Sequence, residues 1–271
     1  DCLEGMKLMP DKSVDLIVTD PPYDLIDTGS GCFGNEARNY HAEYGSICGD
    51  DALKMAEKED TCGYQESVSM IKIRKEISAI SLSFDYSILH EMIRVCKIPN
   101  IYVWCSRSQI RRIIDIFDDC GLSIDLLEWH KTNPIPTCGS SYLHDTELCV
   151  FARGAGVVFN KGFNDKRHYF ISEVNKTDKQ DFKHPTIKPL EFIKSMIRNS
   201  SNEGGVVLDP FCGSGTTCMA AKELGRKYLG FEINERWHKV AVDRLNGITA
   251  NGQTSIFTDF EELEKKDGQS R

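Results

Sequence analysis

A carboxylate, two prolines and an aromatic ring follow one another at Asp20, Pro21, Pro22 and Tyr23. The prolines fix the backbone and carry no N–H group, so this loop offers carbonyl acceptors beside the Asp20 carboxylate, with the Tyr23 ring next to them. Acceptors beside an aromatic ring suit a flat molecule that carries an amino group. The alternative is a stiff turn that only ends a strand.

A second group of residues with chemical potential lies nearly 200 residues further along the chain. Gly213, Ser214 and Gly215 form a glycine-rich turn, which lets a ligand approach the backbone at the start of a helix. No lysine follows Gly215, which disfavours a P-loop, and the spacing fails the dinucleotide pattern G-x-G-x-x-G. Glu232 comes about 20 residues later, where an acid commonly accepts hydrogen bonds from ribose hydroxyls. The glycine-rich turn and Glu232 together predict a binding site for a nucleoside cofactor without a pyrophosphate.

Each group follows an apolar run that is typical of a buried strand, at 14–18 and 206–209. Similar runs predict strands at 101–104, 124–129, 147–151 and 228–231, and helical spacing predicts helices at 2–9, 84–96, 108–120, 190–197, 216–224 and 234–245. Their alternation predicts an α/β, Rossmann-like, mainly parallel twisted sheet with helices on both faces. No helix separates 124–129 from 147–151, so we expect an antiparallel hairpin at the sheet edge. If the strands before Asp20 and Gly213 are neighbours, both loops meet at the switch point of one sheet.

Residues 153–183 combine basic and aromatic side chains while the aliphatic periodicity lapses. Cations suit phosphates and rings stack on bases, so we interpret this segment as a small target-recognition insertion that binds nucleic acid. An ordinary solvated insertion is the alternative. The candidate nucleic-acid-binding residues are Lys131, Arg153, Lys161, Lys166, Arg167, Lys176 and Lys179.

The composition describes a chain that can bury a full core, with 271 residues that are 40% hydrophobic and 27% charged. No apolar run approaches the roughly 18 residues of a membrane span, so we expect no membrane partner and a cytoplasmic protein. Asp1 is not an initiator Met, so we expect native residues before it. Eleven scattered cysteines without a C-x-x-C pair predict free thiols and no metal site. The net charge of -8 argues against a surface coated by nucleic acid, but not against a local basic groove.

Three ordered motifs resemble the β-class DNA amino-methyltransferases, and particularly their phage-like members. They are Val-Asp-Leu-Ile-Val-Thr-Asp-Pro-Pro-Tyr at 14–23, His-Pro-Thr-Ile-Lys-Pro-Leu at 184–190 and Val-Leu-Asp-Pro-Phe-Cys-Gly-Ser-Gly-Thr-Thr at 207–217. The stretch Trp-His-Lys-Thr-Asn-Pro at 129–134 and the later Glu147 resemble the same family. The similarity, which covers nearly the whole chain, implies a catalytic half at 1–152 with a long loop at 24–65, a target-recognition segment at 153–183, a cofactor-binding half at 184–250 and a polar tail at 251–271.

The resemblance implies methyl transfer from S-adenosylmethionine to the exocyclic amino group of a flipped base in double-stranded DNA, with S-adenosylhomocysteine as product and no metal. Asp20 and the Pro21 carbonyl would accept hydrogen bonds from the amino group, within the rigid loop that Pro22 completes, and Tyr23 would stack on the base. The residues implied for the cofactor are Asp1, Asp209, Phe211, Gly213, Ser214, Gly215, Thr216 and Glu232, with His184, Thr186 and Lys188 near its methionine part.

Asp20 favours adenine N6 as the target, because in this family Asp is commoner at this position among adenine enzymes and Ser among cytosine enzymes. Methylation of cytosine N4 is the nearest alternative, and a catalytically silent DNA-binding relative is a third hypothesis. The sequence leaves open whether the protein acts with a restriction nuclease, alone or in a phage, and whether it forms a homodimer.

Overall fold

The computed structural model describes residues 1–23, 84–134, 142–160, 162, 166–174 and 187–248. Contacts divide the chain into two units, Asp1–Pro21 with Asp85–Asn133 and Asp145–Arg271, and Pro22–Phe84 with Pro134–His144. Nearly all described residues belong to the first unit, whose architecture follows. The expected loop 24–65 and tail 251–271 lie outside the described residues.

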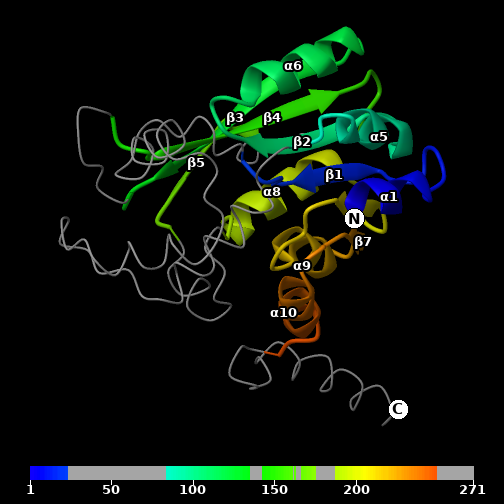
Figure 1. Cartoon of the computed structure of the whole chain (residues 1–271). Coiled ribbons are helices and arrows are strands. Elements are labelled where there is room, and N and C mark those ends of the chain that lie inside the picture. Colours follow the sequence, from blue (N-terminus) through cyan, green and yellow to red (C-terminus); the bar gives the residue numbers. More distant parts are fainter. Residues whose placement is uncertain (24–83, 135–141, 161, 163–165, 175–186, 249–271) are drawn as a thin grey trace, which may run out of the picture. The chain divides into compact units, whose positions relative to one another are not determined.

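A seven-stranded sheet organises the first unit (Figure 1). In spatial order its strands are β5 (Tyr169–Ser172), β3 (Ser123–Lys131), β4 (Thr146–Arg153), β2 (Asn100–Cys105), β1 (Leu16–Thr19), β6 (Val206–Asp209) and β7 (Lys227–Gly230). Among these strands β4 alone runs antiparallel to its neighbours. The mainly parallel sheet and the antiparallel hairpin β3–β4 are therefore confirmed, but the prediction that the hairpin lies at the sheet edge is wrong, because β5 pairs with β3 on its outer side.

The hairpin is followed in the sheet by one further strand that the sequence did not predict. β5 pairs in parallel with β3, with Trp129 opposite Phe170, and thereby takes the outermost position. It comes from the segment 153–183, where the lapse in aliphatic periodicity gave no strand signal. Part of the expected insertion therefore belongs to the sheet.

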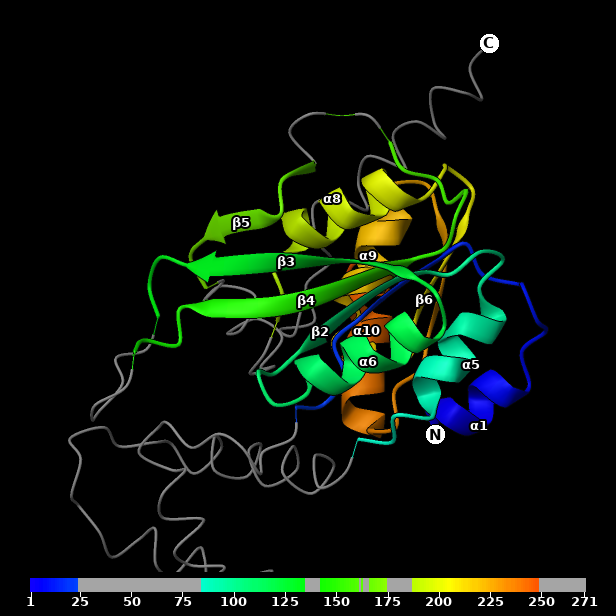
Figure 2. The same cartoon turned by 90° about the horizontal axis from the view of Figure 1, so that it is seen from above.

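Helices cover both faces of the sheet, as predicted (Figures 1 and 2). One face carries α1 (Cys2–Lys7), α5 (Ile88–Val95) and α6 (Ile110–Asp119), and the other carries α8 (Leu190–Ser200) and α9 (Thr216–Glu223), with α10 (Glu235–Leu245) beside α9. Apolar residues at helical spacing create the faces that pack inward. In α6, for example, Ile113 and Phe117 are fully buried.

The central strands are apolar because helices cover both of their faces. Every residue of β1 and β2 is buried. Under α8, the Tyr102 and Phe151 rings of adjacent strands stack with centroids 4.0 Å apart. Cys105 and Cys149 are buried free thiols within these strands, as the cysteine pattern predicted. Such close packing fixes the strand ends, where the candidate site residues lie.

Candidate active site at the carboxyl edge of the sheet

Asp20 lies directly after β1, beside the end of β6. The two strands are parallel neighbours, with Ile17 opposite Leu208, so their carboxyl ends are adjacent. The hydroxyl of Thr19 donates a 2.7 Å hydrogen bond to Oδ1 of Asp209 and links the two ends. The expected meeting of the two loops at the switch point, between β1 and β6, is therefore observed.

The Asp209 carboxylate is buried, with 4% of the residue exposed. Its Oδ1 atom also accepts a 3.1 Å hydrogen bond from the backbone N–H of Phe211. Burial raises the pKa of Asp209 to about 6, although the hydrogen bonds oppose this shift. A buried carboxyl group with a raised pKa therefore lies beside Asp20, at the start of the glycine-rich turn.

The glycine-rich turn leads into the N-terminus of α9. Gly213 and Gly215 have φ values of 49° and 78°, which a residue with a side chain adopts only at a cost. A Cβ atom on Gly215 would also lie 3.0 Å from the Cβ of Ala241. The hydroxyl of Thr216 accepts a 2.9 Å hydrogen bond from the buried Arg244, so α10 holds the first turn of α9 in place. The result is a rigid turn whose backbone a ligand can approach at the positive end of a helix.

Glu232 follows β7 and faces the glycine-rich turn. One carboxylate oxygen, Oε2, accepts a 2.9 Å hydrogen bond from the backbone N–H of Gly213, and Oε1 accepts one of 2.8 Å from Asn234. Each carboxylate oxygen has a second lone pair that can accept from a hydroxyl group. The structure therefore brings the predicted acid and the predicted turn together, and Glu232 keeps acceptor capacity for hydroxyl groups.

Asp20 belongs to a chain of four alternating charges. The ammonium group of Lys188 lies 2.6 Å from Oδ2 of Asp20 and 2.9 Å from Oε2 of Glu147. The ammonium group of Lys131 lies 2.6 Å from Oε1 of Glu147. Lys188 is only 6% exposed and its ammonium lies 5.0 Å from the Trp104 ring centroid. We call Asp20, Lys188, Glu147 and Lys131 the ion chain.

The ion chain keeps its members charged in spite of burial. Burial alone would raise the pKa of Glu147, but Lys188 and Lys131 outweigh it and lower that pKa to about 2. Burial would lower the pKa of Lys188, but Asp20 and Glu147 outweigh it and raise that pKa. Lys188 was expected near the methionine part of a cofactor and Lys131 on nucleic acid, whereas the structure pairs both with carboxylates. The sequence did not predict Glu147 as a site residue. The signal that could have identified it is an acidic residue near the start of an otherwise apolar strand.

Two of the predicted residues, Asp1 and Arg153, have printed partners other than Asp20. Asp1 caps α1 by accepting hydrogen bonds from the backbone of Leu3 and Glu4, at 2.8 and 3.2 Å. Arg153 lies at the opposite end of β4 from Glu147, at the amino edge of the sheet, and pairs with Asp125 at 2.5 Å. These contacts are local, and the cofactor role of Asp1 and the nucleic-acid role of Arg153 stay predictions.

Other candidate residues divide into three groups. Lys166 and Arg167 precede β5 and lie near aromatic rings, with Lys166 5.4 Å from the Phe159 centroid and Arg167 6.0 Å from that of Tyr169. Lys161, Lys176, Lys179, His184 and Thr186 lie outside the described residues. Pro22 and Tyr23 belong to the second unit and are not placed relative to the sheet.

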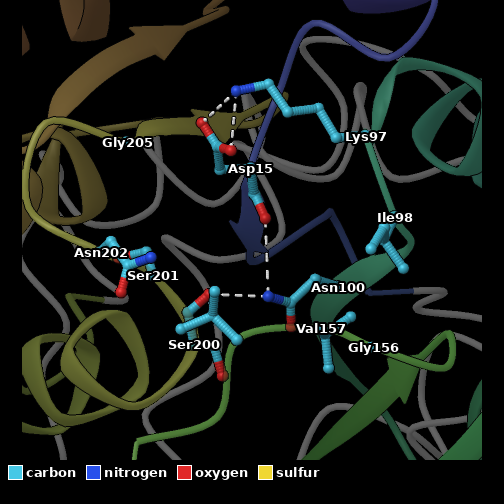
Figure 3. Close-up of a pocket in the computed structure, with 11 residues that line it drawn as sticks. Asp15, Lys97, Ile98, Asn100, Gly156, Val157, Ser200, Ser201, Asn202 and Gly205 are labelled. Carbon is cyan, nitrogen blue, oxygen red and sulfur yellow. Dashed lines mark hydrogen bonds and ion pairs between the residues drawn. The ribbon is translucent and has the colours of Figure 1, made fainter.

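A pocket at the opposite, amino edge of the sheet lies between β1, β2 and α8 (Figure 3). Its polar groups are tied to one another: Lys97 pairs with Asp15 at 2.8 Å, and the Asn100 amide donates a 2.7 Å hydrogen bond to the Ser200 carbonyl. These contacts join the two strands to the helix. In the part of the chain that the structure describes, no His, Cys, Asp and Glu side chains cluster as metal ligands, and no helix is long and apolar enough to cross a membrane.

Comparisons with known proteins agree with this geometry. The profile of the DNA methylase family N6_N4_Mtase matches residues 14–243. The type II methyltransferase M2.DpnII of Streptococcus pneumoniae is 29% identical over 270 residues, covering 90% of this chain and 87% of the relative. The type II methyltransferase M.HinfI of Haemophilus influenzae is 31% identical over 271 residues, covering 93% and 68%.

Solved structures show the same arrangement of the fold. The M1.HpyAVI–SAM complex has a TM-score of 0.57 and 25% identity, over 91% of this chain and 96% of that one. The cytosine-N4-specific PvuII DNA methyltransferase has a TM-score of 0.60, over 93% of this chain and 86% of that one. At 17% sequence identity, this similarity shows only that the two proteins share a fold.

Proposed function

This chain belongs to the N6_N4_Mtase family of DNA methylases, and on that premise we propose that it transfers a methyl group from S-adenosylmethionine to the N6 amino group of adenine in double-stranded DNA. The observation that carries the proposal is the hydrogen bond from Thr19 to Asp209, which holds the Asp20 loop beside the glycine-rich turn. Two reactants held in such adjacent loops react as if within one molecule.

The residues at the ends of β6 and β7 fit this cofactor. Glu232 offers carboxylate oxygens to ribose hydroxyls, and the turn at Gly213 and Gly215 admits a ligand close to the backbone. The negative charge of Asp209 suits a cationic cofactor, and the similar M1.HpyAVI structure is a complex with SAM. When bound, S-adenosylmethionine supplies an electrophilic methyl group. The chain's own residues bind and orient the two reactants.

Asp20 and the carbonyl of Pro21 act on the target amino group. The lone pair of an exocyclic base amine is delocalised into the ring, which makes the nitrogen a poor nucleophile. Hydrogen bonds from its two N–H groups to Asp20 and Pro21 favour a pyramidal nitrogen whose lone pair points at the methyl group. Lys188 orients the Asp20 carboxylate through the 2.6 Å contact. Positioning and electrostatics supply the catalysis.

The base has to leave the duplex to reach this loop. Extrusion costs a few kcal/mol in lost stacking. Tyr23 provides an aromatic platform for the extruded ring, and the basic residues Lys166 and Arg167 hold the phosphate backbone. The aspartate at position 20 favours adenine over cytosine by the resemblance described above.

Nucleoside mass spectrometry of DNA treated with the protein and S-adenosylmethionine tests this function. We expect N6-methyladenine in the digest. Methylcytosine alone would overturn adenine as the target, in favour of cytosine N4. Cofactor binding without any methylated nucleoside would favour a silent DNA-binding relative. RNA treated in parallel should stay unmethylated.

A DNA substrate implies that the protein works in the cytoplasm of a bacterial or phage-infected cell. We propose this location and a restriction–modification role like that of type II relatives. Sequencing of methylated DNA from an expressing host would identify the recognition site, and sedimentation velocity would distinguish a monomer from a homodimer.

A further inference from the structure

Glu147 occupies the centre of the ion chain. Its two carboxylate oxygens contact different lysines, Oε1 at 2.6 Å from Lys131 and Oε2 at 2.9 Å from Lys188. The register of β4 against β2 and β3 sets this position, because Glu147 lies opposite Trp129, two residues before Lys131. The residue therefore joins the hairpin to Lys188, which in turn contacts Asp20.

The four formal charges of the ion chain sum to zero. Asp20 and Glu147 contribute two negative charges, and Lys188 and Lys131 contribute two positive ones. The methyl group moves as a cation while its bond to sulfur breaks, so positive charge grows on the target nitrogen until that nitrogen releases a proton to solvent. A negative Asp20 stabilises that charge, whereas a nearby ammonium without a counter-ion opposes it.

We infer that Glu147 is a positioning residue for methyl transfer: it holds the Lys188 ammonium and balances its charge, so that the negative field of Asp20 reaches the target amine. The inference rests on the proposed function. Lys188 fixes the orientation of Asp20 but also reduces its field, and Glu147 on the far side of the ammonium offsets that reduction. Lys131 completes the balance by pairing with the second oxygen of Glu147.

A purely structural role explains the ion chain less well. Removing charges from water is expensive, and replacement of buried ion pairs by apolar residues often leaves stability unchanged or improves it. The neighbours of Lys188 include the Trp104 ring, against which an apolar side chain would pack. The ion chain is also no proton relay, because the low pKa of Glu147 and the raised pKa of Lys188 keep both groups charged at neutral pH.

The test is a charge-rescue experiment under single-turnover conditions, with saturating S-adenosylmethionine and DNA. We expect Glu147→Gln to slow transfer roughly tenfold to hundredfold and to change the Kd for S-adenosylmethionine less than about threefold. The double variant Glu147→Gln with Lys131→Gln restores zero net charge and should recover at least about fivefold of the lost rate. Recovery on removing a second charge shows that charge and not side-chain shape is what Glu147 supplies, and the small change in the Kd for S-adenosylmethionine shows that the fold is intact.

Glu91→Gln is the matched control. Glu91 has 22% of its side chain exposed, against 21% for Glu147, and pairs with Arg94 at 2.7 Å in α5, outside the active edge. This variant should transfer methyl groups at the wild-type rate.

The outcomes separate the inference from the proposed function. A wild-type chain that leaves DNA unmethylated refutes the function itself. An active wild type with an equally fast Glu147→Gln variant refutes only the inference, as does a double variant no faster than the single one. If Glu147→Gln does not fold, the double variant decides alone: a rate within tenfold of wild type supports the charge balance, and a larger loss contradicts it.

Discussion

Replacement of Asp209 by Asn should stabilise the chain at neutral and alkaline pH. Burial raises the pKa of this carboxyl from 3.8 to about 6. The folded chain therefore keeps a proton that the unfolded chain releases between about pH 4 and 6, and stability falls as the pH rises through that window. The shift corresponds to about 3 kcal/mol lost above pH 6. The Asn side chain does not ionise, so the free energy of unfolding of Asp209→Asn does not fall in this pH range.

Asn can keep two of the hydrogen bonds of Asp209. Its side-chain oxygen can accept from the Thr19 hydroxyl and the Phe211 N–H as Oδ1 does now. The new NH2 group is buried and reduces the gain by about 1–2 kcal/mol where it finds no acceptor. We therefore expect a net stabilisation of about 1–3 kcal/mol at pH 8, and none at pH 4.

Urea unfolding of the cofactor-free chain at pH 4, 6 and 8 measures this difference. The exposed Asp115, with 63% of its side chain accessible, provides the control variant Asp115→Asn, which should follow the wild type at every pH. An advantage of Asp209→Asn that does not change with pH, or one that grows as the pH falls, would refute the reasoning. The same variant should bind S-adenosylmethionine more weakly, because it removes a negative charge from the proposed cofactor pocket.

Two further substitutions test the cofactor half. Glu232→Gln should raise the Kd for S-adenosylmethionine roughly tenfold to hundredfold in calorimetric titration, because an amide has only one oxygen to accept from both Gly213 and the ribose. An unchanged Kd would show that Glu232 does not bind the cofactor. Gly215→Ala should lower the free energy of unfolding by about 1–3 kcal/mol, because it combines a φ of 78° with a Cβ contact of 3.0 Å to Ala241; wild-type stability in urea would contradict the observed backbone conformation.

The sequence predicted the elements whose signals are local. The apolar runs before Asp20 and Gly213 gave both central strands, and the glycines located the turn at α9. An apolar run does not reveal which strand lies next to it in the sheet. The sequence therefore could not predict that β1 and β6 are neighbours, which the pairing of Ile17 with Leu208 shows.

The parts that sequence reasoning missed depend on long-range pairing. Glu147 and Lys188 lie 41 residues apart in sequence, and only the antiparallel course of β4 brings the first to the active edge. The same antiparallel direction of β4 places Arg153 at the opposite edge of the sheet. The sequence had grouped Arg153 with the DNA-binding residues because it begins a segment rich in basic residues. β5 was missed because the exposure of Tyr169 and Ile171 leaves little apolar periodicity in an edge strand.

The central claim is a division of labour between two loops at one switch point. Asp20 handles the target amine, and the turn at Gly213 with Glu232 holds the cofactor. Asp20→Ala separates these tasks, because it leaves the 2.9 Å hydrogen bond between Gly213 and Glu232 untouched and leaves Lys188 paired with Glu147.

The most direct measurement is the methyl-transfer rate of Asp20→Ala, taken together with its Kd for S-adenosylmethionine. We predict loss of transfer to below about a thousandth of the wild-type rate, with a Kd within about threefold of wild type. Equal loss of cofactor binding and transfer, or transfer at the wild-type rate, would contradict the account.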